Sequence, residues 1–309
     1  MSGGDAGTGE IVVFGSLNAD LTVRVERFPE PGETLGGSEL VTAPGGKSSN
    51  QAAAAAVLGS SVRLVGAVGD DSHGSFLLQQ ARDAGVDTSG VIQDEEHATG
   101  SAMIVVDAAG ENTIIVSPGA NGGHQAETAR QTDLEGAAVL CLCLEVPLAA
   151  VEAVAEQARS SGTQVILNLS PYTSVSDSLL QATDVLLVNQ SEAELLLDAE
   201  VDGDWSAALE RLVDLGVERT VVTLGADGAV VLDGTAEAPE QVVAIDSPAV
   251  DAVDTTGCGD AFTGAVAHAL ATGSSLVEAS KLAARVGALA ATREGAQSSY
   301  GAFADLPPE

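Results

Sequence analysis

The sequence predicts an α/β fold, with a largely parallel, buried sheet flanked by helices and a small β appendage. Short β-branched runs alternate with helical patterns along most of the chain, which is typical of parallel strands joined by crossover helices. Two segments, about residues 18–41 and 98–116, break this alternation. The chain has 309 residues, 45% of them hydrophobic, which is enough to bury a large core.

Six apolar runs are the predicted strands of the sheet, and they span residues 11–14, 62–68, 139–144, 164–167, 185–188 and 220–224. Helical patterns lie between them. Residues 147–160 begin with a proline and residues 205–215 precede Gly216, which are ordinary start and stop signals of a helix. The alanine-rich residues 52–57 are expected to form one packed helix.

The two interrupting segments predict the small β appendage. Residues 103–106 and 113–116 flank a polar stretch and indicate a hairpin. No linker separates independent units, so we expect one domain over residues 1–309 with these segments inserted. Residues 1–10 and 307–309 are predicted to be frayed tails.

The charge balance excludes two classes of partner. The chain has 12 Lys and Arg against 45 Asp and Glu, a formal net charge of −33, which repels nucleic acids and anionic lipid surfaces. Such a chain also repels itself unless salt screens the charge. We therefore predict a protein from a halophile, the alternative being an ordinary acidic protein.

The cysteines and the amino terminus bear on location. Cys141, Cys143 and Cys258 are odd in number and show no C-x-x-C spacing, so neither a disulfide framework nor a zinc site is expected. Cys141 and Cys143 are predicted to be core residues on one face of a strand. The sequence shows no signal-like segment and no apolar run of membrane-spanning length, so we expect a cytoplasmic protein.

Residues 254–260, DTTGCGD, precede a predicted helix at 261–271. Glycines that enter a helix leave backbone N–H groups free to bind an oxyanion or phosphate. Asp260 would lie in the first turn beside that anion site. It would either accept a proton from an attacking hydroxyl or merely interact favourably with the helix dipole.

Residues 45–50, GGKSSN, resemble the end of a P-loop, but Val41 stands where that motif requires glycine. Lys47 amid glycines would suit a polyhydroxylated ligand, the alternative being a solvated loop lysine. Asn18 and Asp20, spaced i, i+2 after the first strand, face the same way and suit sugar hydroxyls. Glu145 is either a helix-start acid or a third sugar contact.

Two later segments follow predicted strands. Ser191 and Glu194 fit a capping box, which would leave Asn189 and Glu192 for phosphate oxygens or hydrated Mg²⁺. Thr223, Gly225 and Gly228 would let a nucleotide approach the backbone, the alternative being a hairpin turn at residues 226–228.

Taken in order, these segments resemble the phosphofructokinase-B family of carbohydrate kinases, over about residues 11–299. The matching motifs are GSLNAD (15–20), GGK (45–47) with Asn50 and Gln51, GAN (119–121), Asn189 with Glu192, DTTGCGD (254–260) and TREGAQ (292–297). The resemblance implies a ribokinase-like fold, doubly wound, with a small β-sheet lid that often pairs with a partner's lid in a homodimer.

The resemblance also implies the role of each site residue. Asp260 would be the base on a primary hydroxyl, with Gly257, Cys258 and Gly259 as the anion hole. The sugar would contact Asn18, Asp20, Gly45, Gly46, Lys47, Asn50 and Glu145. ATP, the co-substrate, and Mg²⁺ would contact Asn189, Glu192, Thr223, Gly225, Gly228 and Gly259. Potassium, an activating ion, would lie among Asp254, Thr256, Ala290, Arg293, Gly295 and Ser299, held largely by backbone oxygens.

Three features depart from the family pattern or stand apart from it. Cys258 replaces an alanine, which leaves the N–H donors unchanged. Ser48 and Ser49 replace a Gly-Ala pair, and we expect them to narrow or polarise the sugar pocket. Arg24 and Arg27 are expected to pair with Glu26 or Glu30, the alternative being that they receive a phosphorylated sugar.

The leading functional hypothesis is transfer of the γ-phosphoryl group of ATP to O5 of D-ribose. Within the family, the alternatives are 2-keto-3-deoxygluconate, fructose, a nucleoside or ribose 1-phosphate as acceptor. A hypothesis of another class is a sugar sensor without catalysis. Residues 257–260 argue against it, because a binder needs neither a base nor an oxyanion hole.

Overall fold

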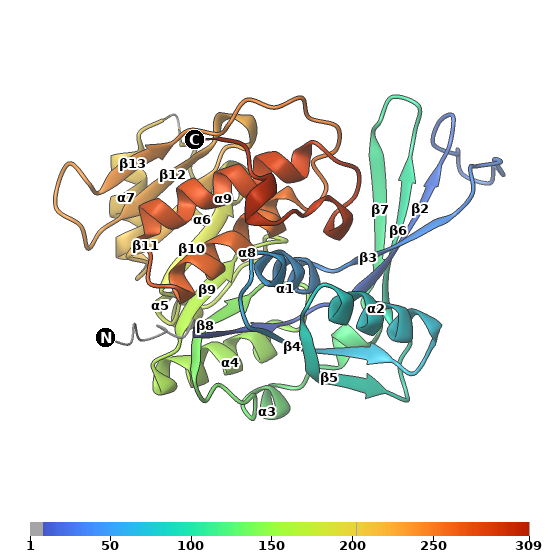
Figure 1. The fold of residues 1–309 in the computed structure, drawn as a ribbon, viewed down its shortest axis with the longest axis horizontal. Helices are drawn as coiled ribbons and strands as arrows, with labels where there is room; N and C mark the ends of the chain where they lie inside the picture. Colours follow the sequence, from blue (N-terminus) through green and yellow to red (C-terminus); the bar gives the residue numbers. More distant parts are fainter. Residues whose placement is uncertain (1–8, 202, 309) are drawn as a thin grey trace.

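The computed structural model describes residues 9–201 and 203–308, and it contains a nine-stranded sheet between two layers of helices. A separate four-stranded sheet projects from one side of this body (Figure 1). The predicted fold class is therefore confirmed.

The large sheet has the order β13-β12-β11-β10-β9-β8-β1-β4-β5, and the strands from β5 to β11 pair in parallel. Its strands are β1 (Glu10–Phe14), β4 (Val62–Gly69), β5 (Asp87–Asp94), β8 (Ala137–Leu142), β9 (Gln164–Asn168), β10 (Val185–Asn189), β11 (Arg219–Thr223), β12 (Ala229–Asp233) and β13 (Val242–Ile245). All six predicted strands are present. Strands β5, β12 and β13 were not predicted; they form the two margins of the sheet, and β12 and β13 are antiparallel.

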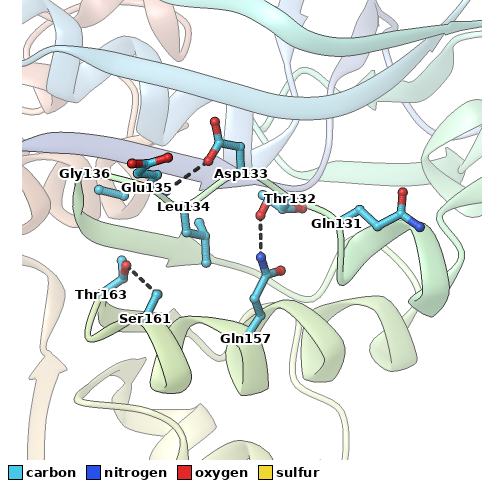
Figure 2. A pocket seen from close by; sticks show the side chains of 10 residues that line it. Gln131, Thr132, Asp133, Leu134, Glu135, Gly136, Gln157, Ser161 and Thr163 are labelled. Carbon is cyan, nitrogen blue, oxygen red and sulfur yellow. Dashed lines mark hydrogen bonds between the residues drawn. The ribbon is translucent and has the colours of Figure 1, made fainter.

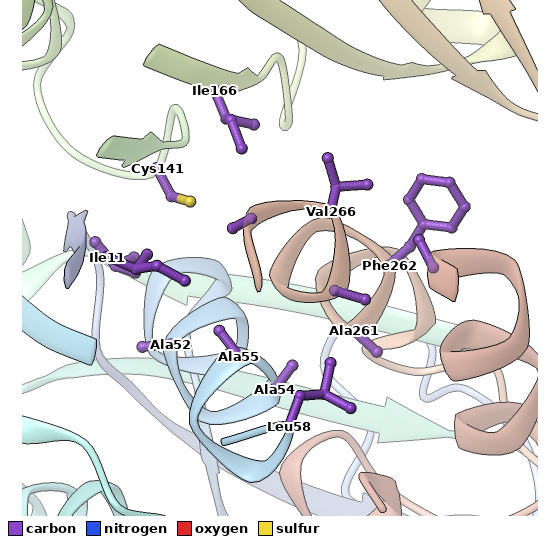
Figure 3. Packing of buried hydrophobic residues seen from close by; sticks show 14 of the residues in the cluster. Ile11, Ala52, Ala54, Ala55, Leu58, Cys141, Ile166, Ala261, Phe262 and Val266 are labelled. Carbon is purple, nitrogen blue, oxygen red and sulfur yellow. The ribbon is translucent and has the colours of Figure 1, made fainter. Parts of the chain in front are cut away.

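The central strands are apolar throughout because helices cover both of their faces. In β1, Ile11 and Val13 belong to one buried cluster, whereas Val12 and Phe14 belong to the other. Figure 3 shows the first cluster, in which small side chains of two helices meet the strands that carry Ile11 and Cys141. Cys141 is a core residue as predicted.

Helices α1, α2, α8 and α9 pack over the first cluster, and the remaining helices contribute to the second. Their bounds are α1 (Lys47–Val57), α2 (Ser72–Asp83), α3 (Ala126–Ala129), α4 (Leu148–Ser161), α5 (Asp177–Gln181), α6 (Gln190–Leu197), α7 (Trp205–Asp214), α8 (Cys258–Ala271) and α9 (Leu276–Ala291). A Cβ at Gly264 of α8 would lie 2.6 Å from the carbonyl oxygen of Gln51 in α1. This glycine therefore lets α1 and α8 approach closely.

The small sheet has the order β3-β2-β6-β7, with β2 (Asn18–Arg24), β3 (Val41–Gly45), β6 (Gly100–Val106) and β7 (Asn112–Ser117). The predicted hairpin is the β6–β7 pair. Strand β2 pairs in parallel with β6, which joins the two segments that interrupted the α/β alternation. Every residue of β7 is exposed.

Of the predicted frayed tails, residues 1–8 and 309 lie outside the described residues. Glu10 is the first residue of β1, and the Pro307 carbonyl oxygen accepts a hydrogen bond from Arg285 Nε at 2.7 Å. Within the described part of the chain, no helix is both long and apolar enough to cross a membrane.

The chain order of the strands reverses beside β1. From β1, the chain adds β4 and β5 on one side, and later β8 to β11 on the other. In open α/β sheets, ligands bind in the crevice beyond the carboxyl ends of the strands at such a switch point. The residues that follow β1 and β8 are therefore expected to lie at a ligand site.

Candidate active site

A cleft of about 250 Å³ lies beyond the carboxyl ends of β9, β10 and β11, against the beginning of α8. Its lining residues are Lys47, Asn168, Ser170, Leu187, Val188, Asn189, Glu192, Thr223, Thr255, Gly257, Gly259, Asp260, Phe262 and Thr263. Seven of the predicted site residues line this cleft: Lys47, Asn189, Glu192, Thr223, Gly257, Gly259 and Asp260.

Asp260 lies in the first turn of α8, where only 6% of its surface is exposed. Asn50 Nδ2 donates to its Oδ2 at 2.9 Å, and Gln51 Nε2 donates to its Oδ1 at 3.3 Å. Both amides come from α1, which the close α1–α8 packing at Gly264 brings alongside. The carboxylate is therefore fixed in position at one end of the cleft.

Gly257 is the N-cap of α8, and its φ of 73° favours glycine. The first turn of a helix leaves N–H groups without helical partners, and Gly257 and Gly259 lie at the cleft wall. The predicted donor at Cys258 is corrected, because its N–H already donates to the Thr255 carbonyl oxygen at 3.2 Å. Tyr300 Oη donates to the Gly257 carbonyl oxygen at 3.1 Å and holds this turn from behind. The half-buried Cys258 thiol contacts the Asp254 carbonyl oxygen at 3.9 Å, away from these donors.

The residues that follow β1 and β8 meet at the switch point. Glu145 Oε2 accepts hydrogen bonds from Ser16 Oγ at 2.6 Å and from the Lys47 backbone N–H at 2.9 Å. Glu145 therefore joins the ends of both strands to the first residue of α1. Gly46, with φ 88°, makes the turn into that helix.

Asn18 and Asp20 lie on β2, at the root of the small sheet. Asn18 Oδ1 accepts from Asn121 Nδ2 at 2.8 Å, and the Asn121 side chain also bonds both backbone groups of Leu17. A Cβ at Gly45 would lie 2.2 Å from Asp20 Oδ2, so glycine at that position leaves room for the carboxylate.

The site is rich in carboxylates. Burial first, and then the charges of Glu145 and Asp260, raise the pKa of Asp20 from 3.8 to about 7. Burial also raises the pKa of Asp260, although Lys47 and the two amides oppose it. Burial alone would lower the pKa of Lys47, but Asp260 and Glu145 raise it, so this lysine stays charged.

On the other side of the cleft, the predicted capping box at Ser191 and Glu194 is wrong. Asn189 is the N-cap of α6, and it exchanges hydrogen bonds with Glu192 at 2.8 and 2.9 Å. Glu194 instead accepts from Gln190 Nε2 and from the Val201 N–H. Glu192 Oε2 accepts the hydrogen bond of the cap, and no hydrogen bond among the described residues engages its Oε1.

Thr223 lines the cleft, whereas Gly225 and Gly228 form the turn between β11 and β12 and do not. A Cβ at Gly228 would lie 2.0 Å from the Ile245 carbonyl oxygen, and its φ is 90°. The structure therefore agrees with the alternative of a hairpin turn for this glycine.

The predicted potassium ligands come from two loops that meet behind the first turn of α8. Asp254 Oδ2 accepts from the Gly295 N–H at 2.8 Å, and Oδ1 accepts from Thr256. Although burial raises the pKa of Asp254, these hydrogen bonds outweigh it and hold the pKa below its ordinary value. The Val253 and Asp254 N–H groups bond the Ala291 carbonyl oxygen, which brings the end of α9 with Ala290 and Arg293 to the same place.

Ser48 and Ser49 are buried and do not line this cleft: Ser48 Oγ contacts Cys143 Sγ at 3.0 Å, and Ser49 Oγ accepts from Gln297. Their effect on the sugar pocket stays a prediction. One expectation about a surface ion pair is corrected. Arg27 pairs with Glu33 rather than with Glu26 or Glu30, in a bidentate contact on the surface.

A second depression, of about 720 Å³, lies at the amino ends of β8 and β9, between the loop before β8 and the end of α4 (Figure 2). Gln157 Nε2 donates to the Thr132 carbonyl oxygen at 2.6 Å along its wall. None of the predicted site residues lines it.

Sequence reasoning missed the roles of Gln51, Asn121, Gln297 and Tyr300, although the first three stand inside the motifs already quoted. The available signal was the amide itself, since a buried amide requires hydrogen-bond partners. The partners of Asn121 and Gln297 are 103 to 248 residues away, so the sequence did not identify them.

The sequence of this chain is similar to those of known carbohydrate kinases. The sequence pattern of the family described as pfkB family carbohydrate kinase matches residues 8–301. Ribokinase of Haemophilus influenzae is 37% identical over 293 residues, which cover 94% of this chain and 94% of that protein. Deoxyribokinase of Salmonella typhi is 34% identical over 296 residues, covering 94% and 95%.

Solved structures agree with the sequence comparison. Arabidopsis thaliana ribokinase, complexed with ribose and ATP, superposes with a TM-score of 0.87 and 31% identity over 96% of this chain and 97% of that one. Thermotoga maritima ribokinase gives a TM-score of 0.85 at the same identity and the same two coverages.

Proposed function

This chain belongs to the pfkB family of carbohydrate kinases, and on that premise we propose that it transfers the γ-phosphoryl group of ATP to the O5 hydroxyl of D-ribose. The observation that carries the proposal is the buried Asp260 carboxylate, which two amides hold beside Gly257 and Gly259 at the start of α8. Relatives named ribokinase, and one structure described with ribose and ATP, support the choice of substrates.

In the proposed reaction, Asp260 accepts the proton of the O5 hydroxyl as that oxygen attacks the γ-phosphorus. The bond from phosphorus to the β–γ bridging oxygen breaks, and ADP leaves with that oxygen. The N–H groups of Gly257 and Gly259 stabilise the charge that develops on the phosphoryl oxygens. Asn18, Asp20, Lys47 and Asn50 would orient the sugar, while Glu145, already engaged by Ser16 and Lys47, holds the start of α1.

The residues present fit two ions. Mg²⁺ bound with ATP would supply positive charge to the phosphates, and Glu192 Oε1, with Asn189 beside it, would hold its hydration shell. Potassium would bind in the loops behind the start of α8, where Asp254 is bonded to Thr256 and to the Gly295 N–H, and backbone oxygens of Thr256, Ala290, Arg293, Gly295 and Ser299 would be its further ligands. In that place the ion would hold the anion-hole turn in its binding conformation.

The test of this function is kcat/KM for ATP-dependent phosphorylation in KCl with Mg²⁺. The panel comprises D-ribose, 2-deoxy-D-ribose, fructose, 2-keto-3-deoxygluconate, a nucleoside and ribose 1-phosphate. We expect the highest kcat/KM with D-ribose. A higher value with another acceptor would overturn ribose and keep the kinase, whereas binding of sugar without any turnover would favour the sensor.

The small sheet is proposed to act as a lid over the sugar and as a homodimer interface. Met103 of β6 and Ile115 of β7 are cross-strand neighbours on one face, and they are 57% and 65% exposed. A second copy would cover this apolar face. We place the enzyme in the cytoplasm, where ATP is available and three free cysteines stay reduced.

A further inference from the structure

The hydrogen bond that the Asp260 carboxylate accepts from Asn50 depends on which end of the Asn50 amide faces it. Asn50 Nδ2 donates to Asp260 Oδ2 at 2.9 Å. The other end of the same amide, Oδ1, accepts from Gln297 Nε2 at 3.0 Å. Asn50 is therefore held from both ends, by the base on one side and by a glutamine on the other.

Gln297 reaches this position from a distant part of the chain. It begins the short 3-10 turn Gln297–Ser299 after α9, and it lies 247 residues from Asn50 along the sequence. Its Nε2 also donates to Ser49 Oγ at 3.0 Å. Two acceptors for the two amide hydrogens fix the nitrogen end of Gln297 toward α1.

The two ends of an asparagine amide have nearly the same shape but opposite hydrogen-bonding character. A flipped Asn50 would place Oδ1 against the carboxylate of Asp260 and its NH₂ group against the NH₂ group of Gln297. Both contacts would be repulsive. The donor of Gln297 therefore holds Asn50 in the orientation that the Asp260 carboxylate also requires, and it still does so when the carboxylate takes up a proton.

We propose that Gln297 is a positioning residue for phosphoryl transfer, because it keeps the donor end of Asn50 directed at the Asp260 carboxylate. This inference rests on the proposed function of Asp260 as the base. The side-chain hydrogen bonds of Gln297 go to Asn50 and Ser49, and none goes to Asp260, so it acts on the base through Asn50.

The consequence for the base follows from its surroundings. The donor from Asn50 favours the ionised carboxylate and opposes the burial that raises its pKa. Without Gln297, the carboxylate keeps its proton to a higher pH. The other ionisable groups that act on Asp260 or feel its charge are Lys47, Glu145, Asp20, Cys258 and Tyr300.

The experiment compares Gln297→Met, which keeps the length and removes the donor, with Gln297→Glu, which replaces the donor by an acceptor. Ser298→Ala is the matched control in the same turn, where the exposed Ser298 hydroxyl bonds only the Glu294 carbonyl oxygen among the described residues. At neutral pH we expect Gln297→Met to lower kcat about 2- to 10-fold, the worth of one neutral hydrogen bond, and Gln297→Glu to lower it further. Ser298→Ala should match the wild type.

The pH profile separates positioning from a structural role. For Gln297→Met, the ascending limb of kcat against pH should move to higher pH, and activity should recover above it, with the KM for ATP unchanged. A loss of equal size at every pH, together with a lower Tm, would overturn the proposal. Wild-type kcat across the whole pH range for both variants would also overturn it.

A second readout does not need turnover. Carboxyl ¹³C NMR of aspartate-labelled protein, with the Asp260 signal assigned from Asp260→Asn, reports the titration directly. The Asp260 signal should titrate at higher pH in Gln297→Met than in the wild type or Ser298→Ala. Identical titrations would contradict the positioning role even in an active kinase, whereas a shifted titration in a protein without kinase activity would contradict the proposed function alone.

Discussion

At the scale of single residues, a substitution of Asp260 should lower catalysis far more than sugar binding. Asp260→Asn keeps the size of the side chain and removes the base, so we expect kcat to fall about 10²–10⁴-fold. Sugar affinity, measured by isothermal titration calorimetry, should stay within a few-fold of the wild type. Normal turnover in this variant would remove Asp260 from the mechanism.

Asp20 makes both sugar binding and stability depend on pH. Its pKa is raised from 3.8 to about 7, so between those values the folded protein holds a proton that the unfolded chain has lost. This contribution to stability is therefore present at low pH and is lost as the pH rises through 7. Asp20→Asn should raise Tm at pH 8 and change it less at pH 4.

The same carboxylate should matter for the sugar. As an acceptor of sugar hydroxyls it must be ionised, so the wild-type KM for sugar should increase as the pH falls below about 7. Asp20→Asn should have a higher KM that no longer varies with pH in this range. A variant whose KM keeps the wild-type pH dependence would assign the effect to another group.

How far the sequence predicts the site depends on where each residue finds its partner. Asp260 and Lys47 stand in motifs whose local backbone already indicates their chemistry, and both line the cleft. The capping box was assigned wrongly because Asn189 and Ser191 both precede a suitably spaced glutamate, and only the strand end at Asn189 decides between them. The hydrogen bond from Gln297 to Asn50 depends on tertiary packing, which no local sequence pattern encodes.

At the scale of elements, the turn into α8 depends on a glycine with a positive φ. Gly257→Ala would strain the backbone by about 1–2 kcal/mol and place a Cβ 2.7 Å from Ala296 Cβ. We expect a lower Tm and a lower kcat, because the N–H groups of residues 257–259 move together. Circular dichroism melting and steady-state kinetics measure the two effects.

Gly259→Ala is the matched control two residues further on. Nothing lies within 4 Å of a Cβ at this position, and alanine is the better helix former by about 1 kcal/mol. Its Tm should equal or exceed that of the wild type. A Tm as low as that of Gly257→Ala would show that the turn tolerates no side chain at all, and the argument from φ would be wrong.

The strands that the sequence predicts are largely buried on both faces, although β12, which is equally buried on both faces, was not predicted. Strands such as β1 and β8 are continuously apolar, and that signal is independent of their neighbours. Strand β5 is an edge strand of mixed polarity, with most residues at least partly exposed, so its sequence resembles a loop. The pairing of β2 with β6 joins segments about 80 residues apart, which only the folded chain defines.

At the scale of the whole molecule, the exposed face of the small sheet tests the proposed dimer. Ile115→Asp places a charge in the centre of the apolar face and should convert the dimer to monomers in sedimentation velocity. Val213→Asp, an exposed apolar position on α7, is the control and should leave the assembly unchanged. A wild-type protein that sediments as a monomer would refute the interface.

The net charge of −33 predicts that salt stabilises the fold. Raising the salt from 0.1 M to 1 M shortens the screening length from about 10 Å to about 3 Å and weakens the self-repulsion. Tm should rise by several degrees, equally in KCl and NaCl. A constant Tm would argue against adaptation to a salt-rich cell, and a rise in KCl alone would assign the effect to a specific potassium site.

The most direct test of the central claim is the structure of the product. The wild-type protein is incubated with Mg²⁺, ATP, KCl and D-ribose, and ³¹P–¹H correlation NMR identifies the carbon that carries the new phosphate. We expect a phosphorus coupled to the two C5 protons, with ADP formed in equal amount. Phosphate on any other carbon, or ADP formed without phosphorylated sugar, would contradict it.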